Sequence, residues 1–222
     1  MKSFILLVIF VLTLGLCLPA SASLTKSYTF SQPTTTWLWG NNVEFPQFNP
    51  ADGQLEKVTI DLSCSGASWA GMENESDSIG QAKIDNASID IFVKKGNVEL
   101  LSLQPFTGSS PMTIVYPYDG TTDFGGTSGF RTADLSGTAT GSLQYTAPAD
   151  LGAYTGTGTI TFWFANNEHL TVGSSLYSPM PLSTFQHSSS GDMTITYTYT
   201  PEPATVALLA MGGVAMIRRK RR

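Results

Sequence analysis

The stretch DMTITYTYT (residues 192–200) alternates between two kinds of side chain. Met193, Ile195, Tyr197 and Tyr199 occupy every second position, and threonines separate them. Because successive side chains of a β-strand point to opposite faces, this pattern predicts a strand with one buried face. Threonine, isoleucine and tyrosine are also residues that favour strands.

Similar alternation occurs in KVTIDLS (57–63), ASIDIFV (87–93) and TITFWF (159–164). Further strands are expected at Ser27–Phe30, Val98–Leu103, Thr113–Tyr118 and Ser136–Thr146. The clusters GNN (40–42), YDGTTDFGGTSG (118–129) and SSSGD (188–192) have the composition of turns and loops. Gly96 and Asn97 predict a hairpin turn. The polar stretch 74–86 is expected to be a long loop or a short helix.

Frequent strands and turns, without a helical period outside the two ends, predict an all-β fold. The expected architecture is a single antiparallel β-sandwich, jelly-roll or immunoglobulin-like, over Ser23–Thr200. A closed barrel is the alternative. An N-terminal signal peptide and a C-terminal hydrophobic helix are expected to flank this domain.

The N-terminal residues have the order of a secretory signal peptide. Lys2 precedes an uninterrupted apolar run, and Ala20-Ser21-Ala22 supplies the small residues that signal peptidase recognises. We therefore predict a signal peptide over residues 1–22 and a mature chain that begins at Ser23. Lipidation of Cys17 is the alternative, although Leu16 occupies the position where a lipoprotein signal has a small residue.

The charge of the chain is unevenly distributed. The formal charge of the whole chain is −5, whereas Ser23–Thr200 carries six cations against sixteen carboxylates, which gives −10. Such an acidic domain repels phosphate backbones, so we expect no nucleic-acid partner. Cys64 alone remains after signal-peptide removal, which excludes an internal disulfide and predicts a buried thiol.

The C-terminal end combines three features in order. Pro201-Glu202-Pro203 precedes the uncharged run Ala204–Ile217, and five consecutive cations close the sequence: Arg218, Arg219, Lys220, Arg221 and Arg222. As a helix, the run would be about 21 Å long, which is short against a hydrocarbon core of about 30 Å. Bilayer thinning and snorkelling of the first arginine would cover the difference. The basic end predicts a stop-transfer segment on the cytoplasmic side.

These features closely resemble the PEP-CTERM sorting signal over residues 201–222. The resemblance implies recognition of Pro201, Glu202 and Pro203 by exosortase, a membrane-embedded enzyme that cuts such tails near the triplet. It also implies a transient transmembrane helix over 204–217 with its basic end at 218–222. Signal peptidase, exosortase and the membrane are then the expected partners.

The body of the chain resembles the choice-of-anchor E domain, a family of exported β-rich domains. The stretches FPQFNPADGQLEKVTIDLS (45–63), DGTTDFGGTSG (119–129) and MTITYTYTPEP (193–203) carry this resemblance. It implies a fold but supplies no activity, cofactor or site residue.

Candidate residues for chemistry are few. The two histidines, His169 and His187, stand in polar, loop-like contexts and no nucleophile elbow is present. The acidic loops 73–77 and 119–123 are candidates for Ca²⁺, although neither has the spacing of an EF-hand. A sugar-stacking platform is a further hypothesis, with six candidate aromatic residues: Trp37, Trp39, Trp69, Tyr116, Tyr118 and Trp163. We predict no catalytic residue, no metal site and no cofactor.

The expected function follows from export and sorting. We predict a non-enzymatic protein, anchored in the membrane as a precursor and then located at the cell surface or outside the cell. Its role is expected to be structural or adhesive, linked to exopolysaccharide or biofilm. The alternatives are a carbohydrate-binding module for exopolysaccharide and a secreted hydrolase.

Overall fold

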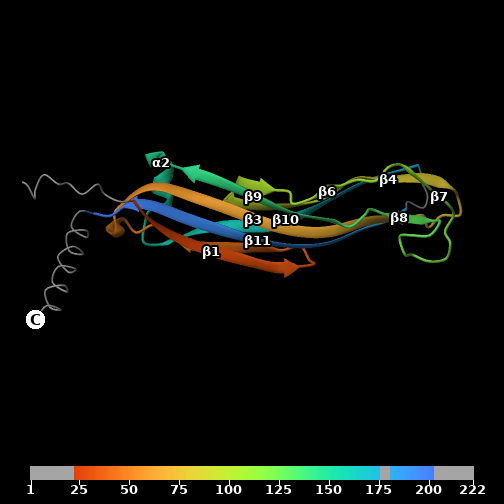
Figure 1. The fold of residues 1–222 in the computed structure, drawn as a ribbon, viewed down its shortest axis with the longest axis horizontal. Coiled ribbons are helices and arrows are strands. Elements are labelled where there is room, and N and C mark those ends of the chain that lie inside the picture. Colours follow the sequence, from red (N-terminus) through yellow and green to blue (C-terminus); the bar gives the residue numbers. More distant parts are fainter. Residues whose placement is uncertain (1–22, 176–180, 203–222) are drawn as a thin grey trace, which may run out of the picture.

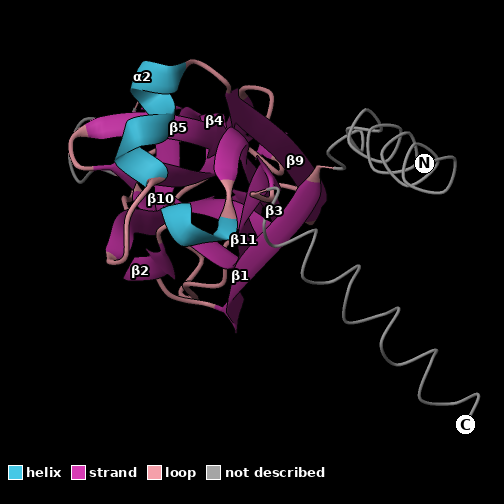
Figure 2. Cartoon of the chain, turned by 90° about the vertical axis from the view of Figure 1, so that its left-hand side faces the viewer, coloured by secondary structure: helices cyan, strands magenta, loops and turns pink. Residues whose placement is uncertain are grey.

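A computed structural model describes residues 23–175 and 181–202. Two antiparallel sheets face each other and form an elongated β-sandwich, so the predicted fold class is confirmed and the closed barrel is excluded (Figures 1 and 2). The predicted signal peptide (1–22), apolar run (204–217) and basic end (218–222) lie outside the described residues. Within the described ranges, no helix is both long enough and apolar enough to cross a membrane.

The first sheet has the strand order β1-β11-β3-β8, with β9 also paired to β3. Its strands are β1 (Leu24–Thr35), β3 (Gln54–Glu73), β8 (Gly129–Arg131), β9 (Leu135–Tyr145) and β11 (Leu182–Thr200). Strand β11 pairs with β3 over nearly its whole length, from Leu182 opposite Glu73 to Thr200 opposite Gln54. Strands β3 and β11 are therefore the two long central strands of the first sheet.

The second sheet has the order β2-β10-β4-β5, and β6 and β7 also pair with β4. Its strands are β2 (Gly40–Pro46), β4 (Gly80–Lys95), β5 (Val98–Leu103), β6 (Thr107–Gly108), β7 (Thr113–Val115) and β10 (Thr159–Ser174). Three short helices lie in the connections: η1 (Pro50–Asp52), α2 (Pro148–Leu151) and η2 (Gly152–Tyr154). The predicted hairpin at Gly96-Asn97 joins β4 to β5, and Gly96 has the positive φ of 58° that this turn requires.

The alternating positions of the predicted strands form the core. Ile60 and Leu62 of β3, Phe162 of β10 and Met193 and Ile195 of β11 are fully buried between the sheets. A second apolar cluster around Met72, Ile84 and Val115 fills the end of the sandwich that is remote from the chain termini (Figure 1). Cys64 is buried and unpaired as predicted, and burial raises the pKa of its thiol to about 11.

Three sequence predictions of loops are wrong. Residues 80–86 belong to β4, so the loop predicted at 74–86 ends at residue 79. Residues 40–42 begin β2, and residues 188–192 lie within β11, where each pairs with β3. Gly191 suits this strand because a Cβ atom there would lie 2.9 Å from the Phe164 ring. Pairing with neighbouring long strands therefore overrides the turn composition of these segments.

Candidate functional site

The two ends of the described domain meet at one end of the sandwich. Leu24, at the start of β1, pairs with Tyr199, and Thr200 is the last residue of β11. Pro201 is buried and Glu202 is exposed. The predicted sorting triplet therefore begins directly at the end of a core strand, with no linker between them. Pro203 lies outside the described residues.

Glu56 of β3 connects the two chain ends. Its carboxylate accepts a hydrogen bond from the Ser23 hydroxyl group at 2.8 Å and another from the Thr200 hydroxyl group. These hydrogen bonds lower the pKa of Glu56, with the bond from Thr200 as the larger cause. Ser23, the first residue after the predicted signal-peptide cut, is thus tied to the residue that precedes the triplet.

Gly53 packs directly beneath the triplet. It has a φ of 144°, and a Cβ atom at this position would lie 2.2 Å from the Thr200 carbonyl oxygen and 2.8 Å from Pro201 Cα. Helix η1 leads into this glycine, and the Asn49 side chain caps the helix through the Ala51 backbone N–H group. The residues Ser23, Gly53, Glu56, Thr200, Pro201 and Glu202 are called the sorting junction below.

The structure places both histidines in strands, which corrects their predicted loop context. His169 of β10 contacts Asp90 of β4 at 2.9 Å. The side chain of His187 of β11 is 5% exposed and its Nδ1 atom lies 3.4 Å from Glu168 Oε2. Burial lowers the pKa of His187, although the carboxylate of Glu168 opposes this shift.

A polar cluster surrounds His187 in the middle of the sandwich. His187 pairs in register with Ser68 of β3, and the atoms His187 Nε2 and Ser68 Oγ are buried without a hydrogen-bonding partner among the described residues. Nearby, Asn166 accepts a hydrogen bond from the Trp39 backbone N–H group at 2.7 Å and donates one to Ser189 Oγ at 2.9 Å. Trp39 is therefore half-buried, with its backbone and indole N–H groups both bonded within the domain.

The six aromatic residues of the predicted sugar platform do not assemble into one surface. Trp39 faces the polar cluster, and Trp69 packs against Phe124 and Arg131. Four of the six are exposed, namely Trp37, Tyr116, Tyr118 and Trp163, and no ring contact joins them among the described residues. A platform of all six residues is therefore wrong, because Trp39 and Trp69 are occupied by contacts within the domain.

The two acidic loops lie together at the end opposite the sorting junction. Glu73 is fully buried and accepts hydrogen bonds from the Phe124 backbone N–H group at 2.7 Å and from Ser128 Oγ at 2.5 Å. Asp119 accepts hydrogen bonds from the backbone and the hydroxyl group of Thr121. Glu73 thus accepts from donors of the 118–129 segment, whereas Asp119 accepts from a donor in its own loop. The described residues contain no group of three or more His, Cys, Asp or Glu side chains that could hold a metal ion.

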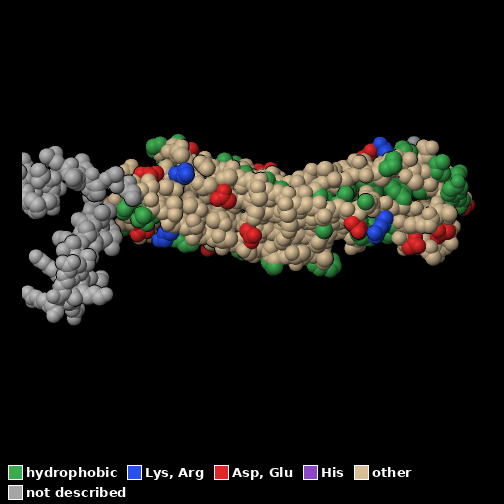
Figure 3. All heavy atoms as spheres, in the orientation of Figure 1, with side chains coloured by type: hydrophobic (Ala, Val, Ile, Leu, Met, Phe, Trp, Pro, Cys, Tyr) green, Lys and Arg blue, Asp and Glu red, His purple; other side chains and the backbone are tan. Residues whose placement is uncertain are grey.

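The outer face of the first sheet carries an ordered field of hydroxyl groups. Across β9, β3, β11 and β1, cross-strand partners form rows of outward side chains, and this surface is called the hydroxyl face. The rows are Gln144–Thr59–Thr196–Ser27, Ser142–Asp61–Thr194–Thr29, Thr140–Ser63–Asp192–Ser31 and Thr138–Ser65–Ser190. In Figure 3 this side is mainly tan, with few charged side chains. Sequence reasoning identified the threonines of β11 but not their alignment with three other strands.

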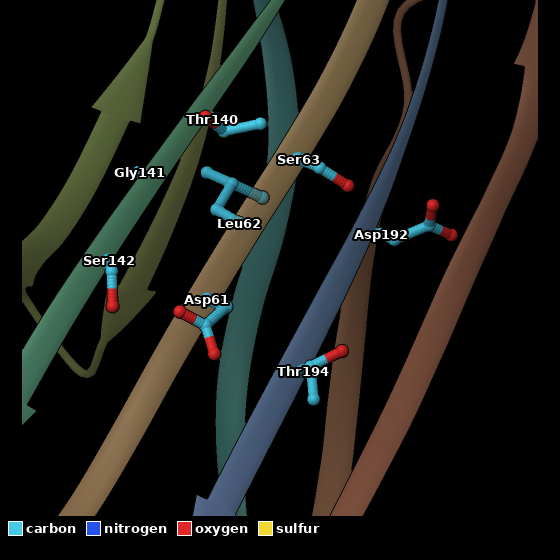
Figure 4. Close-up of a pocket in the computed structure, with 8 residues that line it drawn as sticks. All are labelled: Asp61, Leu62, Ser63, Thr140, Gly141, Ser142, Asp192 and Thr194. Carbon is cyan, nitrogen blue, oxygen red and sulfur yellow. The ribbon is translucent and has the colours of Figure 1, made fainter.

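An open hollow of about 420 Å³ lies on the hydroxyl face, where β9, β3 and β11 run side by side. Figure 4 shows its polar side chains on the three strands: Thr140 and Ser142 from β9, Asp61 and Ser63 from β3, and Asp192 and Thr194 from β11. Thr194 shares a hydrogen bond of 2.8 Å with Thr29 of β1. Carboxylate and hydroxyl oxygens thus line one shallow depression.

Comparison with known proteins identifies the C-terminal end. Residues 200–222 match the family model of the PEP-CTERM protein-sorting motif. The matched segment begins at Thr200, so it overlaps the last residue of the core strand β11. No curated protein matches the chain.

Among solved structures, similar chains come from infectious bursal disease virus. Its derived T=1 particles match with a TM-score of 0.24 and 11% identity over 82% of this chain and 36% of the viral chain. Its VP2 subviral particle matches with a TM-score of 0.21 and 12% identity over 82% of this chain and 38% of that chain. This chain therefore spans less than half the length of the viral chains.

Proposed function

From the PEP-CTERM protein-sorting motif that this chain carries at its C-terminal end, we propose that the β-sandwich is a structural or adhesive domain of the cell surface, linked to exopolysaccharide or biofilm. The motif implies an exported protein that exosortase processes. The signal peptide over residues 1–22 and the cut before Ser23 are part of this proposal. That the body is a choice-of-anchor E domain also stays a prediction.

The observation that carries this proposal is the direct connection between the motif and the fold. Pro201 is buried against Gly53, and the Thr200 hydroxyl group donates a hydrogen bond to Glu56, so the motif begins where a strand is packed against the domain. Proline fixes the backbone φ angle and lacks an N–H donor, which favours an extended triplet outside any helix. Glu202 is thereby presented close to the domain, in the position where a membrane enzyme would meet it.

Deletion of the gene in an exosortase-carrying host that forms biofilm tests the role. Loss of the chain should reduce retention of cells in the matrix, and the full chain should restore it. A chain that ends at Thr200 should be secreted but should not restore retention. Intact mass of the cell-surface form should show loss of both ends. If deletion leaves matrix retention unchanged, the structural or adhesive role is wrong.

We propose that the protein is not an enzyme, although one arrangement favours the hydrolase alternative. Glu168, His187 and Ser68 have the residue types of an acyl-transfer triad, and His187 Nδ1 faces the carboxylate. Ser68 is only 7% exposed, which hinders access of a substrate to its hydroxyl group. An active-site-directed fluorophosphonate should therefore leave Ser68 unlabelled. Labelling that disappears in Ser68→Ala and His187→Gln would establish a hydrolase instead.

A further inference from the structure

The composition of the hydroxyl face restricts the class of ligand that it suits. All but three of its outward side chains are serine or threonine, and the exceptions are Asp61, Asp192 and Gln144. Protein interfaces are centred on apolar and aromatic residues, which this face lacks. Anionic polymers require cations, which it also lacks. A neutral ligand rich in hydroxyl groups matches it, because hydroxyl groups donate and accept hydrogen bonds as serine and threonine do.

The hollow contains hydrogen-bonding groups that the protein itself does not use. Within the described residues, five side chains along it form no hydrogen bond and no ion pair: Asp61, Ser63, Thr140, Ser142 and Asp192. In the free protein these groups bond to water. Ligand hydroxyl groups that reproduce those bonds can replace the water without loss of hydrogen bonding. The two carboxylates accept only, so they suit the hydroxyl donors of a sugar.

The spacing of the face suits an extended chain. Neighbouring strands in a sheet lie about 4.8 Å apart, and alternate residues of one strand about 6.7 Å apart. Hydroxyl groups therefore recur at regular intervals across four strands. Because sheets twist by roughly 20° per strand, a rigid crystal surface cannot follow these rows, whereas a flexible polymer can.

We propose that the hydroxyl face binds an extended, neutral polysaccharide that is seated in the hollow between β9, β3 and β11. This proposal rests on the structural or adhesive surface role proposed above, and it specifies the class of ligand that the domain would bind in that role. Binding occurs through hydrogen bonds, since no aromatic ring lies among these rows. Each lost hydrogen bond then changes the affinity by about two- to tenfold, and long chains bind better than short ones because several sites engage together.

Affinity electrophoresis of the cell-surface form tests the proposal. Gels contain hydroxyethyl cellulose, dextran or galactomannan as neutral polymers, or carboxymethyl cellulose, which shares the backbone of the first but carries carboxylates. We expect retardation by at least one neutral polymer and much less by carboxymethyl cellulose. Short cello-oligosaccharides should not compete at the same sugar concentration.

The double variant Thr140→Val with Ser142→Ala removes two hydroxyl groups from the hollow. Both residues point outward on β9, so the core of the sandwich is unchanged. We expect about tenfold weaker retardation, with an unchanged melting temperature as evidence of folding. The matched control is Thr161→Val, an exposed threonine on β10 of the other sheet, and it should behave as wild type. Absence of retardation by every neutral polymer, equal retardation by carboxymethyl cellulose, or an unaffected double variant would overturn the proposal.

Comparison of polymer binding in gels with matrix retention in the biofilm-forming host separates the ligand class from the surface role. A wild-type protein that reaches the surface and supports matrix retention but binds no neutral polymer refutes the ligand class alone. A wild-type protein that binds the polymer in gels but does not support matrix retention refutes the surface role alone.

Discussion

The Thr200 hydroxyl group donates a hydrogen bond to the carboxylate of Glu56. The residue before the sorting triplet is therefore bonded to the neighbouring strand β3. The same carboxylate accepts a hydrogen bond from Ser23. One exposed side chain therefore fixes both the start and the end of the domain. Removal of a signal peptide before Ser23 would leave this arrangement intact.

Replacement of Glu56 by Gln is expected to change the dependence of stability on pH. The pKa of Glu56 lies below its ordinary value of 4.5 because Thr200 and Ser23 donate to the charged form. Because the pKa is lower in the folded state, the ionised carboxylate stabilises the fold at pH values above 4.5. This contribution is lost as the pH falls through the pKa of the folded state. Wild type should melt above Glu56→Gln at pH 7, and the difference should shrink below about pH 4.5.

Thermal melts followed by circular dichroism from pH 7 to pH 3 would measure this difference. Glu44→Gln is the control, because the Glu44 side chain is exposed on β2 and its carboxylate forms no hydrogen bond among the described residues. Its melting curve should follow wild type at every pH. A constant gap between wild type and Glu56→Gln would show that the carboxylate charge does not matter here.

Gly53→Ala should destabilise the sorting junction. The φ of 144° is nearly restricted to glycine, and the new methyl group would collide with the Thr200 carbonyl oxygen. We expect a loss of about 2–4 kcal/mol in the free energy of unfolding. Gly96→Ala is the control: its φ is 58° but a Cβ atom there meets nothing within 4 Å, so it should cost only about 1 kcal/mol. Urea unfolding that gives equal losses would exclude the collision.

The sequence predicts the core better than the connections. Alternation places Ile60, Phe162 and Ile195 correctly on buried faces, because each strand has one face in the core. The same reasoning fails at residues 188–192, where serine and glycine indicate a turn but the chain continues as a strand. Pairing with β3 is a non-local property, and no local pattern reports it. The sorting triplet, by contrast, is recognisable from sequence because its parts are contiguous.

The contacts of the sorting junction and of the hydroxyl face are also non-local, so the sequence does not predict them. Nothing near Glu56 indicates that it meets Ser23 and Thr200, which are far from it in the chain. The hydroxyl face likewise requires the register of four strands. The hydroxyl-bearing positions of β9 and β3 alternate in sequence, but their alignment into rows follows only from the pairing of Asp61 with Ser142 and Thr194.

Ile60→Asp should unfold the domain or weaken it severely. Ile60 is fully buried and pairs with Leu143 and Ile195 on the two neighbouring strands. A carboxylate there has no partner, so we expect a loss of more than about 3 kcal/mol. Thr59→Asp, which points outward on the same strand, is the control and should stay folded with a β-type circular dichroism spectrum. A stable Ile60→Asp domain would contradict the assignment of the two faces.

His187 should make stability depend on pH near neutrality. Burial lowers the pKa of His187 below its ordinary value of 6.5, so the unfolded chain binds a proton more readily than the folded domain. Stability should therefore fall as the pH decreases through 6.5 and level off below the folded-state pKa. The variant His187→Gln should lose this slope, whereas His169→Gln should retain it. Urea midpoints between pH 5 and pH 8 would show whether the slope belongs to His187.

The sorting triplet should be needed for processing, and the apolar run with its basic end for retention. Replacement of Pro201, Glu202 and Pro203 by alanine removes two fixed φ angles and the exposed carboxylate, while Thr200 keeps its bond to Glu56. In a host that carries an exosortase, this variant should accumulate as an uncut precursor in the membrane fraction. Deletion of residues 204–222 should instead release the domain into the medium.

These two variants separate recognition from anchoring because only the first leaves the apolar run in place. A matched control replaces Thr198 by valine, two residues before the junction, and should be processed at the wild-type rate. Pulse labelling followed by fractionation gives the rate at which the tail is removed. If the triple-alanine tail disappears at the wild-type rate, the enzyme does not read the triplet. Recognition would then reside in residues 204–222, and the close contact of Pro201 with Gly53 would serve the fold alone.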